Sequence, residues 1–199
     1  MTTLRERKKQ RTRRQLVDTA IELFTAHGFD AVTLDRLVGE VEVSQRTFFR
    51  MFASKEDVAL DPERHFWRSF AAALREAPLD GPLLGVLEGV LLANIAAMPP
   101  EWTVQFRASR RLAEATPALN AKSLRFCADA TAEVVTGLAG RTGADPGGLP
   151  LRLAVDLMLA AWNAAVHDWP DEDGGLPRLA QDVRAAFAAL PAALTLTVT

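Results

Sequence analysis

Apolar residues recur at helical spacing through most of the chain, and no segment keeps the two-residue alternation of a half-buried strand. Leu16, Ala20 and Leu23 form one stripe of a first helix, which we expect to end near His27 with Gly28 as its C-cap. Prolines and glycines separate further helical stretches, predicted over 82–98, 100–113, 117–139, 149–167 and 177–190. The pattern therefore predicts an all-α fold.

Three short helices are predicted to follow the first one closely. Thr33, Ser44 and Ser54 each precede an apolar stretch, and each can cap a helix by accepting a hydrogen bond from an exposed amide. Val43 and Phe48 have the spacing of a hydrophobic staple around Ser44. Two helices joined by so short a turn are typical of a helix-turn-helix.

Length and composition fit a small domain followed by a larger one. With 199 residues, 49% of them hydrophobic, the chain can bury a sizeable core. We place a three-helix helix-turn-helix unit at 1–54 and a larger α-helical domain at 55–199. The apolar stretches 82–98 and 149–166 are interrupted by polar side chains, so they are interpreted as buried helices and not as membrane spans.

Charge is concentrated at the N-terminus. The whole chain has a formal net charge of −2, yet residues 1–14 hold seven lysines and arginines and one glutamate. A basic arm on an otherwise acidic chain suggests a nucleic-acid contact, although solubilising basic tails are also common. This polar N-terminus does not resemble a secretory signal, and a single cysteine, Cys127, fits a reducing cytoplasm.

The third short helix carries residues that can read DNA. If Phe48 and Phe52 point inward, the opposite face shows Arg46, which can pair with guanine, and Gln45, which can pair with adenine. Helix N-termini favour phosphate. The candidate DNA-binding residues are Thr33, Ser44, Gln45, Arg46, Thr47, Phe49, Arg50 and Lys55. The alternative for Arg46 and Arg50 is a merely solvated helix face.

Residues 12–57 resemble the N-terminal domain of the TetR family of regulators. The elements that carry the resemblance are LFTAHGF (Leu23 to Phe29), Thr33, Val43-Ser44, the run Thr47 to Phe52, and Ser54-Lys55-Glu56. The resemblance implies a fold of about nine helices, a homodimer and, by default, repression. Two positions depart from the family pattern: Glu42 replaces a turn glycine, and Phe49 replaces a tyrosine.

The last two predicted helices carry apolar residues on more than one side. One stripe of the helix at 149–167 contains Leu151, Val155 and Met158, and a second contains Leu153 and Leu157. The TetR resemblance implies that these two helices form a homodimer interface. An entirely intramolecular bundle remains the alternative.

Large aromatic residues lie between the helix-turn-helix and this expected interface. The candidate ligand-binding residues are Phe70, Trp102, Phe106, Phe126, Trp162 and Asn163, and the side chains that could orient a ligand include Arg107, Arg110 and His167. This set favours an apolar or mildly anionic small-molecule effector, whereas the simpler interpretation assigns the aromatics to the core. Asp61-Pro62-Glu63 has the pattern of a fresh helix start, which leaves open whether the fourth helix is kinked or split there. If it is, our hypothesis is that Pro62 provides a hinge between the DNA-binding unit and the larger domain.

No sequence motif indicates an enzyme. His27, His65 and His167 are far apart, and no nucleophile elbow or P-loop is present. We therefore predict no catalytic residue, metal site or cofactor, and interpret Cys127 as a core thiol, with a redox sensor as the alternative. The predicted function is a cytoplasmic, homodimeric repressor that a small molecule releases from a palindromic double-stranded DNA operator. The alternative is a helical protein-interaction or ligand-binding module without specific operator binding.

Overall fold

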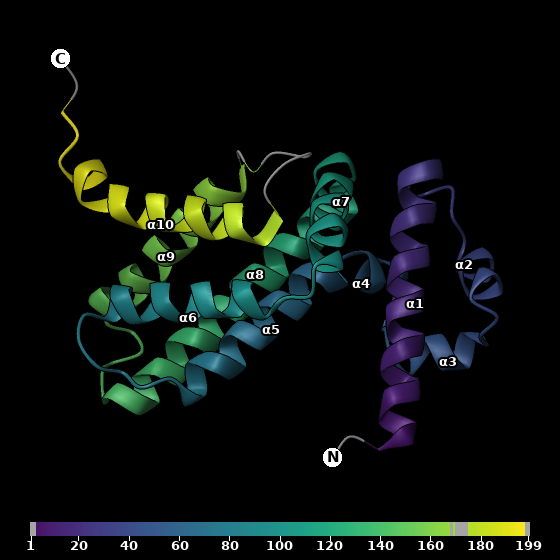
Figure 1. The fold of residues 1–199 in the computed structure, drawn as a ribbon, viewed down its shortest axis with the longest axis horizontal. Coiled ribbons are helices and arrows are strands. Elements are labelled where there is room, and N and C mark those ends of the chain that lie inside the picture. Colours follow the sequence, from purple (N-terminus) through teal and green to yellow (C-terminus); the bar gives the residue numbers. More distant parts are fainter. Residues whose placement is uncertain (1–2, 168, 170–174, 198–199) are drawn as a thin grey trace. The chain divides into compact units, whose positions relative to one another are not determined.

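The computed structural model describes residues 3–167, 169 and 175–197. Within these residues the chain forms helices and no strand (Figure 1), so the all-α prediction is confirmed. The ten helices found there are α1 (Leu4–His27), α2 (Leu34–Glu40), α3 (Gln45–Phe49), α4 (Lys55–Ala59), α5 (Asp61–Glu76), α6 (Leu83–Ala97), α7 (Glu101–Ala115), α8 (Pro117–Thr142), α9 (Leu149–His167) and α10 (Gly175–Leu194).

Contacts along the chain define two compact units. The first unit comprises Met1–His65 and Val104–Phe126, and the second comprises Phe66–Thr103 and Cys127–Thr199. Helices α5, α7 and α8 each contribute residues to both units. The first unit thus takes in more of the chain than the helix-turn-helix, and the domain division at 54/55 stays a prediction.

The first unit is built on one face of α1. Leu16, Ala20 and Phe24 are fully buried there, together with Leu37 of α2 and Phe48 of α3. Figure 1 shows α2 and α3 as consecutive short helices beside α1. The predicted helix starts are confirmed by three cap hydrogen bonds, in which the hydroxyls of the residues before α2, α3 and α4 each accept from an amide three residues on.

The basic arm is helical. Helix α1 begins at Leu4, and the Thr3 hydroxyl caps it by accepting from the Glu6 amide at 3.2 Å. No proline or glycine interrupts the helix until Gly28, which has a φ of 82° and closes it as predicted. The arginines and lysines of the arm are good helix formers, so the arm continues α1 as its first turns.

The chain breaks between α4 and α5 at Leu60, which has φ −95° and ψ 5°. Pro62 is the second residue of α5, in the first helical turn, where its missing N–H removes no intrahelical bond. The predicted break therefore occurs two residues before the proline. A hinge function for Pro62 stays a prediction.

In the second unit, α9 packs against α6 and α10. Leu151, Val155 and Met158 lie on the buried face of α9, and Val183 and Phe187 lie on that of α10. By length and apolarity alone α9 could cross a membrane, but buried core helices pass the same test.

Helix α10 extends beyond its predicted end at residue 190. It continues through Pro191 to Leu194. The prediction that it ends at 190 was therefore wrong, because a proline near a helix end removes only one backbone hydrogen bond from a turn that is already fraying.

Candidate nucleic-acid interface

A tight turn joins α2 to α3. The amides of Glu42 and Val43 donate to the carbonyls of Gly39 and Val38 at 3.1 and 3.0 Å. Glu42 has a φ of 54°, and among the described residues it is the only non-glycine residue with a positive φ. The turn therefore places a glutamate in the left-handed conformation, which glycine would adopt more easily.

One face of α3 is open to solvent. Gln45, Arg46 and Arg50 are exposed, and Phe49 keeps 53% of its surface exposed. Its ring centre lies 5.5 Å from that of the buried Phe48, and the two rings are nearly perpendicular. Phe48 is fully buried and anchors the helix. This arrangement presents two guanidinium groups, one amide and one aromatic ring to solvent, and DNA reading by this face stays a prediction.

Neighbouring contacts fix the start of α3. The Ser44 hydroxyl accepts from the Thr47 amide at 3.2 Å and lies 3.0 Å from the Thr47 hydroxyl. The Gln45 amide group donates to the Asp35 carboxylate on α2, which links the two helices. Thr33 is exposed, and its hydroxyl accepts from the Arg36 amide at 3.2 Å.

Lys55 differs from the other candidate DNA-binding residues, because its ammonium group is turned inward. Its Nζ donates to the carbonyls of Phe29 and Val32 at 2.7 and 2.8 Å, and it lies 4.2 Å from the centre of the Phe29 ring. These bonds attach α4 to the loop before α2. No sequence pattern indicated this role, since the two carbonyls belong to residues far earlier in the chain.

Helix α1 and helix α3 together line a basic hollow of about 610 Å³. Lys8 and Lys9 contribute from α1, and Thr47 and Arg50 from α3 and its end. Arg13 holds the two sides in place, since it donates to the Met51 carbonyl at 2.9 Å. A positively charged concavity beside an exposed helix is suited to a phosphate backbone.

A buried carboxylate organises the start of α4. Asp57 Oδ1 accepts from Arg64 of α5 at 2.6 Å and from Lys122 of α8 at 2.9 Å, and its Oδ2 accepts from the Ala53 amide at 3.1 Å. Burial by itself raises the pKa of Asp57, but the hydrogen bond from Lys122 and the charge of Arg64 outweigh it and lower that pKa. Lys122 also donates to the Ser54 hydroxyl at 2.7 Å, so a side chain of α8 contacts the N-cap residue of α4 directly.

Three of the candidate ligand-binding aromatics, Phe70, Trp102 and Trp162, pack against other aromatic rings. In the second unit the Phe66 ring stacks with those of Trp102 and Trp162, at centroid distances of 5.2 and 4.5 Å, and Phe70 is fully buried. Asn163, in contrast, is exposed. The stacked ring faces are thus covered by one another.

The other two candidate aromatics belong to the first unit. Phe106 is 1% exposed, and the half-buried Phe126 lies with its ring centre 5.1 Å from the Arg64 guanidinium. The structure therefore does not bring the six candidate ligand-binding residues together within one unit, and their role in ligand binding stays a prediction.

Two hollows lie between α5 and α8 in the second unit. The outer one has a volume of about 460 Å³ and is lined by Ala71, Leu74 and Arg75 of α5 and by the α8 residues Ala132, Glu133, Val134, Thr136, Gly137, Leu138 and Arg141. The inner one has a volume of about 20 Å³ and is lined by Trp67 of α5, by α8 residues including Cys127, and by Val155, Met158 and Leu159 of α9. Val134 lines both. Small side chains on one face of 130–137 were the only sequence signal for this feature.

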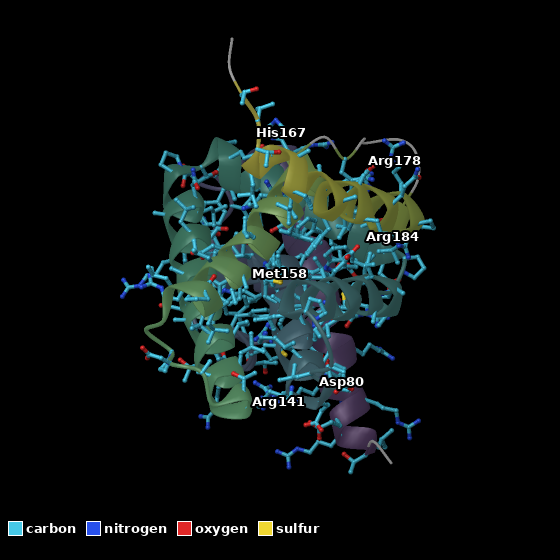
Figure 2. The ribbon with its side chains drawn as sticks, turned by 90° about the vertical axis from the view of Figure 1, so that its left-hand side faces the viewer. Asp80, Arg141, Met158, His167, Arg178 and Arg184 are labelled. Atoms are coloured by element: carbon cyan, nitrogen blue, oxygen red, sulfur yellow. The ribbon has the colours of Figure 1, made fainter. Side chains whose placement is uncertain are left out.

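The ends of the second unit can be followed in Figure 2. His167 lies at one end, at the close of α9, and Arg141 lies at the other, near the end of α8. Met158 lies between them on α9, and Arg178 and Arg184 project from α10.

Within the described residues no group of three histidine, cysteine or acidic side chains could hold a metal ion.

Known proteins match both parts of the chain. Residues 16–61 match the family model of bacterial regulatory proteins of the tetR family, and residues 81–195 match that of the MftR C-terminal domain. The HTH-type transcriptional regulator TcmR of Streptomyces glaucescens is 37% identical over 147 residues, which are 71% of this chain and 65% of TcmR. MftR of Mycobacterium tuberculosis, named for the regulation of mycofactocin biosynthesis, is 29% identical over 179 residues, 85% of this chain and 86% of MftR.

Solved structures share the fold at low sequence identity. The complex of SmeT with triclosan has a TM-score of 0.57 and 18% identity, covering 92% of this chain and 90% of that one. PfmR, a TetR-family transcriptional regulator from Thermus thermophilus, has a TM-score of 0.51 and 16% identity, covering 88% and 96%. These structures share the fold over most of the chain.

Proposed function

Since the chain belongs to the TetR family of bacterial regulatory proteins and is a DNA-binding transcriptional regulator, we propose that it is a cytoplasmic repressor that binds a palindromic operator as a homodimer. A small-molecule effector releases the operator. The observation that carries the proposal is the exposed face of α3 beside a basic hollow formed with α1.

The exposed face of α3 reads the operator in the major groove. Arg46 pairs with a guanine and Gln45 with an adenine, because these side chains match the hydrogen-bonding edges of those bases. Phe49 supplies an apolar surface for a thymine methyl group or a sugar. Arg50 and the α1 lysines bind phosphates, which fixes the position of α3 on the duplex without reading sequence.

The homodimer forms through α9 and α10. On α9 the face opposite the buried stripe is apolar yet uncovered: Leu153 is 54% exposed, and Ala160 and Ala164 are exposed with it. Small residues at this spacing allow close approach of a second copy of the helix. A two-fold dimer places two recognition helices on half-sites about 34–36 Å apart, or a multiple of this distance.

The effector is an apolar or mildly anionic small molecule. Triclosan, in the SmeT complex, is one such compound bound by a protein of this fold. The effector binds the second unit and lowers operator affinity by favouring a different arrangement of the helices that reach α4.

The first experiment measures binding of the full chain to the DNA upstream of its own gene by fluorescence anisotropy. An Arg46→Ala variant should lose about 1–3 kcal/mol of discrimination between operator and mismatched DNA. Arg125→Ala, which removes an exposed arginine of α8, serves as the matched control and should bind like wild type. Equal binding of every DNA sequence, unaffected by Arg46→Ala, would overturn operator reading by α3.

A second experiment tests the basic turns of α1. Lys8 and Lys9 are replaced together by glutamine, which keeps the helix but removes two charges from the hollow. The slope of log affinity against log salt should become shallower by about 0.9 for each phosphate that the variant no longer neutralises. An unchanged slope in this variant would show that α1 does not contact the operator phosphates.

A further inference from the structure

We infer that the effector binds in the seam between α5 and α8, meaning the outer hollow of about 460 Å³. The inferred ligand is a drug-sized molecule with an apolar body and one anionic end. This inference rests on the proposed function, because it gives the effector of the regulator a site and a chemical class.

The outer hollow has the size and lining of a small-molecule site. Its volume of about 460 Å³ falls within the usual range of about 300–1,000 Å³ for ligand pockets. Leu74, Val134 and Leu138 give it apolar walls, and Ala71 and Gly137 leave space between them. Apart from its chain neighbours and the backbone of its own helix, Gly137 has no atom within 4 Å of the position that a Cβ would take.

The seam is held open by contacts at its outer end. Arg141 of α8 donates to the carbonyl of Leu74 in the last turn of α5 at 2.5 Å, and to that of Ala77, directly after α5, at 2.6 Å. Nearby, Arg75 of α5 pairs with Glu133 of α8 at 3.1 Å. These bonds join the two helices directly, so the space between the helices is preformed and a ligand need not create it.

Charge at the mouth indicates the anionic end. Two guanidinium groups, of Arg75 and Arg141, stand against the single carboxylate of Glu133. The Arg75–Glu133 pair is mostly exposed, with side chains 57% and 66% accessible, so an incoming carboxylate or sulfonate can replace Glu133 at little cost. An apolar body in the seam then leaves its acidic group at these arginines.

The seam also lies on the two helices that hold α4. Helix α5 continues from the seam back to Arg64, and α8 continues back to Lys122. Both of these side chains bind Asp57 of α4 in the first unit. A ligand that changes the spacing of α5 and α8 therefore acts on the helices that fix α4, which explains how binding here lowers operator affinity.

The test uses two fluorescent probes with nearly the same aromatic body. 1-Anilinonaphthalene-8-sulfonate carries an anionic group, and N-phenyl-1-naphthylamine lacks it. The full chain should bind both, and the anionic probe several-fold more tightly. Arg75→Gln should remove this preference without weakening the neutral probe. If the wild-type chain binds neither probe, the inferred site is wrong. If it binds both with equal affinity, the inferred anionic ligand class is wrong.

Gly137→Phe should fill the outer hollow and lower affinity for both probes at least tenfold. Gly140→Phe is the matched control, because Gly140 also lies in α8 with open space around its Cβ but does not line the hollow, and it should change affinity less than twofold. Ala71→Leu fills the hollow from α5 and gives a second, independent block. Unchanged binding in both blocking variants refutes the site.

Operator binding without probe separates the two proposals. Gly137→Phe should bind operator like wild type, since it lies outside the first unit. Abolished probe binding with intact operator binding supports the seam. If operator binding is intact but probe binding is unchanged in the blocking variants, the seam is refuted and the proposed function still holds. A change in oligomeric state on Gly137→Phe, measured by sedimentation, shows that a second copy covers the hollow and also refutes it.

Discussion

The turn before α3 stores strain that a single substitution should release. Glu42 has a φ of 54°, and this left-handed conformation costs an L-residue about 1–2 kcal/mol. Glycine adopts it without that cost, but loses about 0.5–1 kcal/mol more through the entropy of the unfolded chain. Glu42 is exposed and its backbone bond to Gly39 does not depend on its side chain. Glu42→Gly should therefore stabilise the protein by about 0.5–1 kcal/mol.

Equilibrium unfolding in urea, followed by far-ultraviolet circular dichroism at a fixed protein concentration, measures this difference. Glu40→Gly is the matched control, because Glu40 is also exposed but ends α2, where glycine should cost about 0.5–1 kcal/mol. The two glycine variants should thus move the transition in opposite directions. In a thermal melt Glu42→Gly should raise Tm by roughly 1–4 °C for a chain of this length. If both variants destabilise to the same extent, the strain argument is wrong.

Three further outcomes follow from the contacts. Lys122→Met should destabilise the first unit by about 1–2 kcal/mol, because it leaves the buried carboxylate of Asp57 with one fewer charged donor; an unchanged Tm would contradict this. The pKa of Asp57 is lowered on folding. Its carboxylate therefore adds to the free energy of unfolding above its unfolded pKa, and this stabilisation is lost as the pH falls through its folded pKa. In Asp57→Asn the free energy of unfolding should therefore fall less steeply as the pH drops below about 4. Urea unfolding midpoints measured at several pH values would show this. Leu153→Glu should shift the sedimentation equilibrium toward monomer, whereas Leu124→Glu, at an exposed leucine of α8, should not.

Features set by neighbouring residues could be predicted from the sequence. Thr33, Ser44 and Ser54 cap their helices because a hydroxyl and the amide three residues on are local partners, whatever the rest of the fold does. Gly28 ends α1 for a similarly local reason. The exposed position of Arg46 followed from the burial of Phe48, since the two lie on different sides of one short helix.

Features that depend on distant partners could not be predicted in this way. Lys55 was selected as a DNA-binding candidate from its place at a helix N-terminus, and its ammonium group donates to the carbonyl of Phe29, 26 residues earlier. The seam between α5 and α8 depends on which helices pair, and Arg141 gives no local sign that it bonds the end of α5. The large aromatics indicated a pocket by composition, but Phe66 stacks on Trp162 and fills the space that composition alone left open.

The placement of the tryptophans makes the two units optically unequal. All four, Trp67, Trp102, Trp162 and Trp169, belong to the second unit, and the chain has no tyrosine. Intrinsic emission therefore reports the stacked aromatic cluster of that unit, while the first unit is dark at those wavelengths. Phe49→Trp, on the exposed face of α3, would place a single emitter in the first unit. Comparison of the two proteins would then distinguish local opening of the helix-turn-helix from unfolding of the second unit.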